Sequence, residues 1–294
     1  MNLKGQIRFH IVVVSYNAGK KLRETLENIL AQDYPYVDVT VRDGGSSDGS
    51  VEEVAPLVLS SGKIRLATRA DKGIYDVMNL AVRELELVDE EDVLSYVLFL
   101  NCGDRFYDHE VLTRADKRIR GWNRRLAMRA QLSPERFVAD VCYGDTFERV
   151  TGQTVKANPH MDDFACYRHL PCHQSVFYAL PLLREEPFDC RFKVRADYEQ
   201  FLRLKYKRHA NICYLNMTIA DYEGKGYSDT NKELSEDERK RIISMYLPKS
   251  KILKYDAYRK ATLQPLREKI ANNPKTAGIY QKVKEVIYER FVAH

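Results

Sequence analysis

Two stretches of this chain, VVVSYN (Val12 to Asn17) and VLFLNCGDRF (Val97 to Phe106), have the same form. Each is a short apolar run that ends abruptly in small, polar or acidic side chains. Buried parallel strands have this pattern where their carboxyl ends meet a ligand crevice. We therefore expect a parallel sheet whose functional residues lie just after these two runs.

A third stretch, VDVTVRDGGSSDGS (Val37 to Ser50), predicts another strand of that sheet. Valines alternate with polar residues up to Asp43, and the glycines that follow let the backbone turn tightly beside a ligand. We expect a helix to start near Ser47, with that side chain as its cap and Asp48 in its first turn. Asp43 could be only a turn former, but its place at a strand end favours a functional role.

Helix and strand patterns alternate through the first half of the chain, with a helix at 20–31, a strand at 64–67 and a helix at 74–85. That order predicts an α/β fold, with a mostly parallel central sheet and helices on both sides. In the second half we expect a helix at 108–129, strands at 137–143, 173–178 and 212–222, a hairpin turn at 149–153 and a helix at 196–204.

The composition sets limits on the environment of this 294-residue protein. No apolar stretch is long enough to cross a bilayer, and the N-terminus runs into a strand without the features of a signal peptide, so we expect a cytoplasmic protein. The six cysteines form no CxxC pair. We therefore expect free thiols, mostly buried, rather than a zinc site or a disulfide framework.

The net charge of +5 is unevenly distributed. Residues 248–294 hold eleven Lys or Arg and four acids, a net +7, which leaves the rest of the chain near −2. We predict one domain at 1–247 and a basic helical extension at 248–294. The extension could dock on an anionic membrane surface, at the inner face of the cytoplasmic membrane, or it could pack in a homodimer or against the domain.

Four carboxylates stand at places where function is expected: Asp43, Asp71, Asp104 and Asp197. Carboxylates that converge on strand ends are costly unless a cation or a proton-transfer role offsets their repulsion, and a hard divalent metal would do so. Neither GxGxxG after the first strand nor GxxxxGK[ST] is present, so the common dinucleotide and P-loop signatures are excluded.

The first 110 residues or so resemble the family 2 glycosyltransferases, which have the GT-A fold. The resemblance is carried by four segments: Ser15-Tyr16-Asn17; Asp43 to Gly49, which matches the family's DGGSxDG form; Asp71 to Asn79, which is similar to DxGIYDAMN; and Leu100 to Asp104, which is similar to LNSGD, a version of the metal-binding DxD motif. The subgroup with these motifs is found in bacterial surface polysaccharide synthesis.

The second half resembles the family more loosely. His173-Gln174 opens a segment similar to the family's HQxxF strand, and Gly224-Lys225-Gly226 resembles the loop that closes over the donor diphosphate. Phe188-Asp189 and the segment around Asp197 resemble the FDE motif and the acidic motif after it. In the family, the later Asp is the catalytic base.

The resemblance implies an inverting transfer of a sugar from a nucleoside diphosphate sugar, with UDP as the expected nucleotide, to a saccharide or lipid-linked saccharide. It gives Asp197 the role of catalytic base and Asp104 that of ligand to Mn²⁺ or Mg²⁺. The donor nucleotide would be held by Ser15, Tyr16, Asn17, Asp43, Asp71, Lys72, Asn101 and Asp104, and other substrate groups by His173, Gln174 and Lys225.

The chain departs from the commoner DxD form, because Asn101 and Gly103 stand where the first two acids would be. Only Asp104 of this motif remains to hold a metal directly. One carboxylate is chemically sufficient for Mg²⁺ when diphosphate oxygens and waters complete the coordination. We therefore expect weak metal affinity without the nucleotide.

Other interpretations remain open. Asp197 could be a surface carboxylate paired with Arg195 or Arg203, and His173 could be a strand histidine whose hydrogen bonds are satisfied internally. The whole chain could be a nucleotidyltransferase that makes sugar nucleotides, or a sugar-nucleotide binding protein without activity. A nucleic-acid binding module is disfavoured, because the first half offers no basic surface interleaved with aromatic residues.

Overall fold

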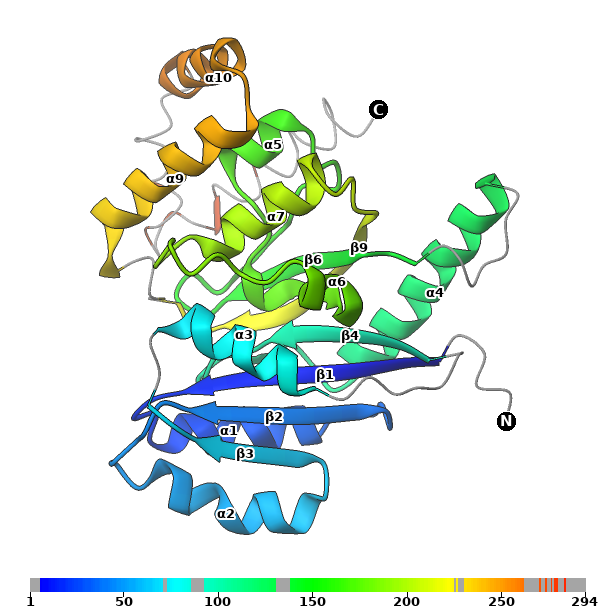
Figure 1. The fold of residues 1–294 in the computed structure, drawn as a ribbon, viewed down its shortest axis with the longest axis vertical. Helices are drawn as coiled ribbons and strands as arrows, with labels where there is room; N and C mark the ends of the chain where they lie inside the picture. Colours follow the sequence, from blue (N-terminus) through cyan, green and yellow to red (C-terminus); the bar gives the residue numbers. More distant parts are fainter. Residues whose placement is uncertain are drawn as a thin grey trace.

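The structure is a computed structural model that describes residues 6–70, 73–85, 93–130, 138–224, 226 and 230–261, together with positions 270, 273, 276, 278, 279 and 283. Within these residues nine strands form one sheet, in the order β3-β2-β1-β4-β8-β6-β9-β5, with β7 paired to β6. The predicted α/β fold with helices flanking a central sheet is confirmed (Figure 1).

The strands are β1 (Gln6–Ser15), β2 (Val37–Asp43), β3 (Ile64–Thr68), β4 (Val93–Phe99), β5 (Arg105–Phe106), β6 (Val141–Glu148), β7 (Gln153–Val155), β8 (Val176–Ala179) and β9 (Ile212–Tyr222). The helices are α1 (Lys20–Leu30), α2 (Ser50–Ser61), α3 (Ile74–Glu84), α4 (Val111–Ala130), α5 (Asp163–Arg168), α6 (Leu180–Glu185), α7 (Ala196–Tyr206), α9 (Lys232–Tyr246) and α10 (Lys249–Ala261). A short 3-10 helix, η2 (His173–Ser175), precedes β8.

The first four strands of the sheet run parallel, and their register brings the predicted strand ends together. Ser15 of β1 lies opposite Asp43 of β2, and Val12 lies opposite Phe99 of β4. The β1 side chains are almost all buried, as expected for a strand covered on both faces. The polar residues after β1, β2 and β4 therefore share one edge of the sheet.

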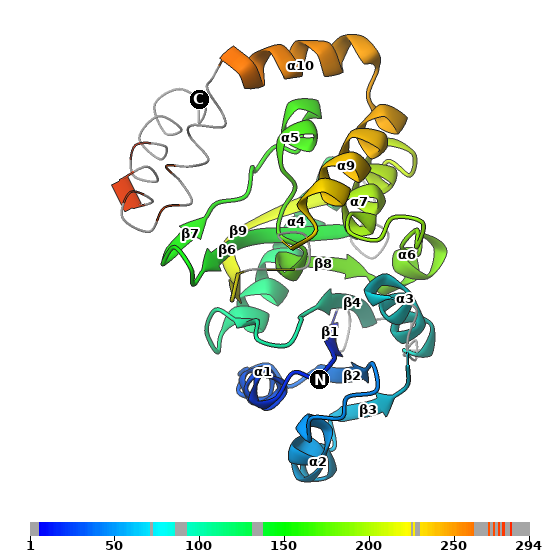
Figure 2. The ribbon, with the colours of Figure 1, turned by 90° about the vertical axis from the view of Figure 1, so that its left-hand side faces the viewer.

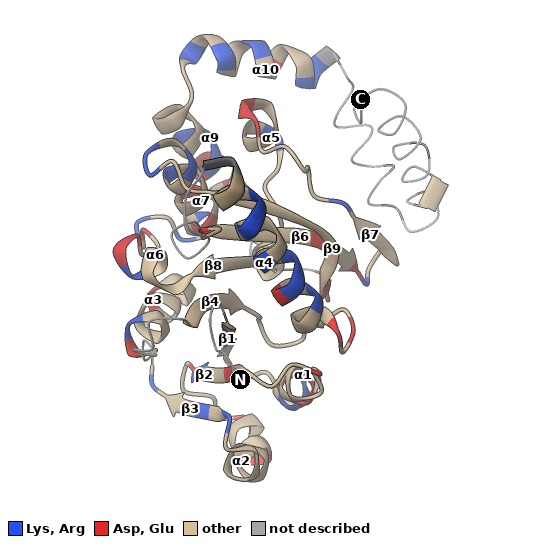
Figure 3. Ribbon diagram, turned by 90° about the vertical axis from the view of Figure 1, so that its right-hand side faces the viewer, with Lys and Arg blue, Asp and Glu red and all other residues tan. Residues whose placement is uncertain are grey.

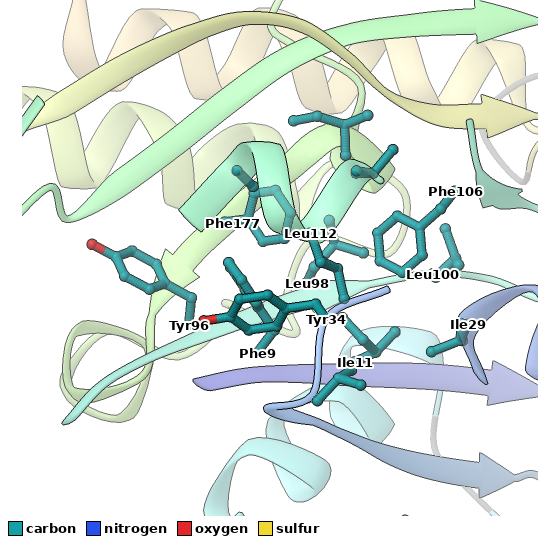
Figure 4. Close-up of a cluster of buried hydrophobic side chains, with 14 of the residues drawn as sticks. Phe9, Ile11, Ile29, Tyr34, Tyr96, Leu98, Leu100, Phe106, Leu112 and Phe177 are labelled. Carbon is teal, nitrogen blue, oxygen red and sulfur yellow. The ribbon is translucent and has the colours of Figure 1, made fainter. Parts of the chain in front are cut away.

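Helices cover both faces of the sheet, and each face has its own hydrophobic core (Figure 2). On one face α1, α2 and α4 pack on the strands through a cluster that includes Phe9, Tyr34, Leu98 and Phe177 (Figure 4). On the other face α3, α6, α7 and α9 form the second cluster. Residues from both halves of the chain enter each cluster, so the two halves fold as one unit around the sheet.

The antiparallel strand β8 joins the halves, because it pairs with β4 on one side and β6 on the other. The predicted strand at 173–178 was wrong at its start, since His173 to Ser175 form a 3-10 turn before β8 begins. The expected hairpin turn between β6 and β7 is confirmed, with Gly152 at φ 65° and its N–H donated to the Glu148 carbonyl at 2.8 Å. Gly152 thus takes the left-handed conformation that glycine favours.

Helix α2 starts at Ser50 with Gly49 as its N-cap, so the cap lies two residues later than the predicted Ser47. Ser47 instead donates its N–H to Asn17 Oδ1 at 3.0 Å. Asp48 does not enter the first turn, because its carboxylate accepts the Ser50 N–H at 3.1 Å and the Gly19 N–H at 2.8 Å. The residues expected to cap a helix therefore tie the loop after β2 to the loop after β1.

Helix α10, the part of the basic extension that the structure describes as a helix, packs on α5. The ring of Tyr255 lies 5.2 Å from that of Phe164 and 5.3 Å from that of Tyr167, and the Tyr167 hydroxyl contacts the carboxylate of Asp256. Lys251 forms an ion pair with Asp163. Basic residues recur along α10 (Figure 3).

The six cysteines are free thiols, as expected, and Cys142, Cys166 and Cys213 are buried. Among the helices that the structure describes, none combines the length and the apolar character needed to cross a membrane.

Candidate active site

One cavity of about 1740 Å³ opens at the carboxyl edge of the parallel strands. Both halves of the chain line it. Of the residues predicted for the site it brings together Ser15, Tyr16, Asn17, Asn101, Asp104, His173, Gln174 and Asp197. Asp71, Lys72 and Lys225 lie outside the described residues, so their predicted roles stay predictions.

Asp43 holds the backbone of the loop after β2 through hydrogen bonds within that loop. The buried carboxylate accepts the N–H groups of Gly45 at 3.0 Å and Ser46 at 2.8 Å, and it contacts the Ser46 hydroxyl. The neighbouring Gly44, not Asp43, lines the cavity. Asp43 therefore fixes the backbone that a ligand would meet.

Of the two residues after β1, Asn17 connects two loops and Tyr16 faces the cavity. Asn17, at φ 46°, accepts the Ser47 N–H at its Oδ1 and donates its own backbone N–H to the Ser46 hydroxyl oxygen at 2.8 Å, so it holds the two loops together. The Tyr16 side chain is 67% exposed and lines the cavity, which leaves its ring face open for stacking on a flat ligand group.

The turn from Asn101 to Asp104 is held by contacts from two other elements. Thr25 of α1 donates its hydroxyl to the Asp104 carbonyl at 2.9 Å and accepts the Gly103 N–H at 3.0 Å. Arg149, after β6, donates to the Gly103 carbonyl at 2.7 Å and pairs with Asp221 at 2.7 Å. The backbone of this turn is thus fixed from both halves of the chain.

Asp104 is 3% exposed and still carries its carboxylate into the cavity lining. Its Oδ1 accepts the N–H of Glu223 at 2.9 Å, and the Gln174 side chain also hydrogen-bonds to it. Burial raises the pKa of Asp104 to about 7, and these hydrogen bonds and Arg149 only partly offset that rise. A cation beside this carboxylate would favour its charged form.

The donor set around Asp104 suits a hard divalent cation. Asn101 also lines the cavity, and its buried Oδ1 has no hydrogen-bond partner within the described part of the chain. An amide oxygen and a carboxylate are the ligand types that Mg²⁺ and Mn²⁺ take in proteins. Asn101 and Asp104 therefore fit the metal that the motif implies, although the described residues contain no group of three or more His, Cys, Asp or Glu that could hold one.

Asp197 lies in the first turn of α7 and lines the cavity. Its Oδ1 accepts the hydroxyl of Tyr75 of α3 at 2.9 Å. The alternative ion pairs are not formed in the described structure: Arg195 donates to the Ser235 hydroxyl at 2.8 Å, and Arg203 pairs with Glu186 and Glu199. Asp197 is thus a half-buried carboxylate that faces the cavity and is oriented by a tyrosine.

His173 packs in an aromatic cluster beneath the same cavity. Its ring stacks on Phe99 at 5.1 Å and lies 5.6 Å from the ring of Phe188. Burial lowers the pKa of His173, while the charge of Asp197 acts in the opposite direction. Both ring nitrogens are buried, and neither has a hydrogen-bond partner among the described residues, so the interpretation as an internally satisfied histidine is wrong.

Sequence reasoning missed two residues that the fold brings into the site. Glu223 follows β9 and donates its N–H to Asp104 in the turn from Asn101 to Asp104, the metal-motif turn. Tyr75 contacts Asp197. Tyr75 stood inside the quoted segment similar to DxGIYDAMN, which could have identified it. Glu223 had no local signal beyond its place before the glycine loop.

The comparisons with known proteins agree with this geometry. Residues 10–115 match the model of the family described as Glycosyl transferase family 2. The chain is 26% identical over 225 residues to the PGL/p-HBAD biosynthesis glycosyltransferase of Mycobacterium bovis, a match that covers 76% of this chain and 79% of the relative. A shorter match, 29% identical over 90 residues, relates it to glycosyltransferase GlyG of Streptococcus pneumoniae and covers 29% of this chain and 30% of that relative.

Two solved structures share the fold at low sequence identity. Residues 1–349 of TarS from S. aureus superpose with a TM-score of 0.57 at 17% identity, covering 81% of this chain and 70% of that one. The mannosyltransferase PcManGT from Pyrobaculum calidifontis, in complex with GDP-Man and Mn²⁺, gives 0.56 at 15% identity, covering 95% and 75%. The resemblance read from the motifs is confirmed: residues 10–115 match the Glycosyl transferase family 2 model, the curated relatives are glycosyltransferases, and the solved structures share the GT-A fold of this chain.

Proposed function

We propose that this protein is a metal-dependent, inverting glycosyltransferase of surface glycan synthesis. It takes a hexosyl or N-acetylhexosaminyl group from a nucleoside diphosphate sugar, with UDP as the expected nucleotide, and transfers it to a saccharide or lipid-linked saccharide. The observation that carries the proposal is that Asp104 and Asp197 line one cavity. A metal-binding carboxylate and a base are the two groups that this reaction needs on either side of the sugar.

The size of the cavity supports a two-substrate reaction. Its volume of about 1740 Å³ exceeds the roughly 300–1,000 Å³ of a pocket for one small ligand. The solved neighbours support the donor class, since TarS was crystallised with UDP and with UDP-GlcNAc, and PcManGT with GDP-Man and Mn²⁺. A cavity of this size can hold an acceptor beside a nucleotide sugar.

In the proposed reaction the donor nucleotide lies on the loops after β1 and β2. The exposed ring of Tyr16 stacks on the base, while Asn17 and Asp43 keep the loop backbone in place. Ser15, Asp71 and Lys72 remain proposed donor contacts on the same edge. Asn101 and Asp104 would hold a divalent cation, which neutralises the charge that grows on the departing diphosphate.

Asp197 supplies the proton transfer. Its carboxylate takes the proton of the attacking acceptor hydroxyl while the new bond forms at the anomeric carbon and the bond from that carbon to the diphosphate oxygen breaks. Attack from the face opposite the leaving group inverts the anomeric carbon. The Tyr75 hydroxyl holds Asp197 Oδ1, so Oδ2 is the oxygen left to face the acceptor. The ring nitrogens of His173, which have no partner among the described residues, are a further proposed contact for substrate hydroxyls, with Gln174 beside it and Lys225 at the glycine loop.

Basic side chains in the cavity lining favour an acceptor that carries phosphate, as a lipid-linked saccharide does. Lys156, His160, Arg168 and His169 line the cavity between β7 and the end of α5. The two acids of that segment are engaged elsewhere, because Asp162 caps α5 by accepting the Ala165 N–H at 2.7 Å and Asp163 pairs with Lys251. This wall of the cavity is therefore basic.

The basic extension is proposed to bring this wall to a membrane. Helix α10 packs on α5, and α5 contributes Phe164 and Arg168 to the cavity lining. On α10, Leu253 is 62% exposed and Tyr258 47% exposed among the lysines, as in a helix that lies on a leaflet. We propose a cytoplasmic enzyme at the inner face of the cytoplasmic membrane, with packing of the extension in a homodimer as the competing arrangement.

The test of the function is a screen of nucleoside diphosphate sugars with Mn²⁺, read by thermal stabilisation and by slow hydrolysis of the donor. We expect one sugar nucleotide to stabilise the protein and to release its nucleoside diphosphate. A nucleotidyltransferase would instead consume a sugar phosphate and a nucleoside triphosphate and release pyrophosphate. A binding protein without activity would be stabilised without any hydrolysis or transfer.

A further inference from the structure

Glu223 lies against the metal-motif turn although it is far from that turn in sequence. It follows β9 directly, and its backbone N–H donates to Asp104 Oδ1 at 2.9 Å. Its side chain accepts from Lys21 Nζ at 2.8 Å, and both residues line the cavity. The structure therefore brings a second carboxylate to the place where the motif itself has only Asp104.

The Glu223 carboxylate occupies the space that a side chain at position 103 would need. Gly103 has φ 97°, and a Cβ added to it would lie 2.5 Å from Glu223 Oε2 and 3.2 Å from its Cδ. In the commoner DxD form an acid stands at this position. Here a glycine stands at that position, and the Glu223 carboxylate lies where a side chain on it would be.

The chemistry of the three groups is consistent with one cation site. Asn101 offers a buried amide oxygen without a partner in the described structure, and Asp104 and Glu223 offer carboxylates. Lys21 offsets the charge of Glu223 on one side, and a cation between Glu223 and Asp104 would offset the repulsion between the two carboxylates. Three protein oxygens, with diphosphate oxygens and water, would complete the coordination that Mg²⁺ or Mn²⁺ requires.

We propose that Glu223 is the second carboxylate of the divalent-cation site and replaces, in space, the acid that the motif lacks at Gly103. The proposal rests on the proposed function, which supplies the cation and the diphosphate. It differs from a role through Lys21, in which Glu223 would only hold that lysine toward the donor phosphates. Within the described residues Glu223 forms its ion pair with Lys21, so the two roles can be separated by substitution.

The experiment measures Mn²⁺ binding directly, by electron paramagnetic resonance of free Mn²⁺ at saturating UDP, together with the thermal shift that Mn²⁺ adds to UDP. The variants are Glu223→Gln, Lys21→Met, and the double variant. Glu24→Gln is the matched control, because Glu24 is also a half-exposed carboxylate paired with a cation, Arg105, but does not line the cavity. Glu223→Asp serves as a second variant that keeps the charge and draws the carboxylate back.

We expect Glu223→Gln to raise the half-saturating Mn²⁺ concentration by about 10- to 100-fold, the range seen when groups around a metal site are removed. Glu223→Asp should lie between native and Glu223→Gln. Lys21→Met should weaken UDP binding and leave the half-saturating Mn²⁺ concentration within about twofold, and the Glu223→Gln effect should persist in the double variant.

Two results would overturn the assignment. One is a Glu223→Gln protein with native melting temperature and native Mn²⁺ affinity. The other is an effect of Glu223→Gln that disappears in the Lys21→Met background, which would show that Glu223 acts through the lysine. If instead the native protein binds UDP without any Mn²⁺ dependence, the metal-dependent function is itself wrong, and the Glu223 proposal falls with it.

Discussion

The hydroxyl of Tyr75 donates to Oδ1 of Asp197 at 2.9 Å, across 122 residues of sequence. The same hydroxyl lies 2.9 Å from the Val194 carbonyl, and the Tyr75 ring is 5.4 Å from that of Phe188. Tyr75 lies in the first turn of α3, and Asp197 lies in the first turn of α7. This contact joins α3, in the first half of the chain, to the proposed base on α7.

Tyr75→Phe is expected to impair turnover more than binding. The ring and its packing are kept, but Asp197 loses a hydrogen bond to a charged group, worth about 1.5–3 kcal/mol. We predict a fall in kcat of roughly 10- to 100-fold with the donor KM little changed. Steady-state kinetics of this variant beside Tyr107→Phe, an exposed tyrosine outside the cavity, would check it. Equal loss in both variants would argue against a positioning role.

The raised pKa of Asp104 predicts how the free energy of unfolding changes with pH in the absence of metal. Burial raises the pKa of its carboxyl to about 7 in the folded protein, whereas the unfolded value is about 3.9. Between these values the folded state binds more protons than the unfolded state, so stability falls as pH rises from about 4 to 7 and stays lower above that.

Asp104→Asn removes this titration. We expect the melting temperature of the metal-free variant to change less between pH 5 and pH 8 than that of the native protein. The extra stabilisation that Mn²⁺ gives with UDP should grow over the same pH range in the native protein, because metal binding displaces the proton, and should be absent in Asp104→Asn. Identical pH profiles for the two proteins would contradict the buried-carboxyl account.

Gly103→Ala tests the close approach of Glu223 to the metal-motif turn. The substitution places a Cβ at φ 97° and within 2.5 Å of Glu223 Oε2. We predict a loss of about 1–3 kcal/mol in the free energy of unfolding from backbone strain, with weaker Mn²⁺ binding as well. Gly152→Ala is the control, since its φ is 65° and no atom lies within 4 Å of the added Cβ. Denaturant unfolding should show the smaller loss in the control, with native Mn²⁺ affinity.

Membrane docking of the extension predicts salt-sensitive binding to anionic vesicles. Each engaged Lys or Arg should contribute about 1 kcal/mol near an anionic surface, and the attraction should weaken with ionic strength. Sedimentation with vesicles that contain phosphatidylserine or only phosphatidylcholine measures this. Dimerisation that is insensitive to salt, without binding to either vesicle, would favour the homodimer arrangement.

The strand-end motifs were predictable because their signal is local. Apolar runs that stop at Ser15, Asp43 and Leu100 specify buried parallel strands, and the parallel register then brings their ends to one edge. Helix and strand positions along the first half followed from the same periodicity. The start of α2 was missed because Ser47 and Asp48 bond to Asn17 and Gly19 of another loop, and a local capping rule cannot anticipate such partners.

The rest of the site depends on contacts between distant segments. Glu223 and Asp104 are 119 residues apart, and nothing near Glu223 in sequence marks it as a neighbour of the metal motif. Asp43 was predicted to contact a ligand, but its carboxylate accepts the N–H groups of Gly45 and Ser46. The sequence alone does not show these hydrogen bonds. Likewise, only the folded structure shows that Arg203 pairs with Glu186 and Glu199. Asp197 therefore hydrogen-bonds to Tyr75 instead of pairing with Arg203.

The most direct test of the proposed mechanism is the rate of glycosyl transfer by Asp197→Asn, measured with donor affinity and melting temperature on the same preparation. Asparagine keeps the shape and can still contact Tyr75, but it cannot take the acceptor proton. The account predicts a fall in turnover of roughly 10²–10⁴-fold with nearly unchanged UDP affinity. Transfer at the native rate would contradict it and would remove Asp197 from the role of base.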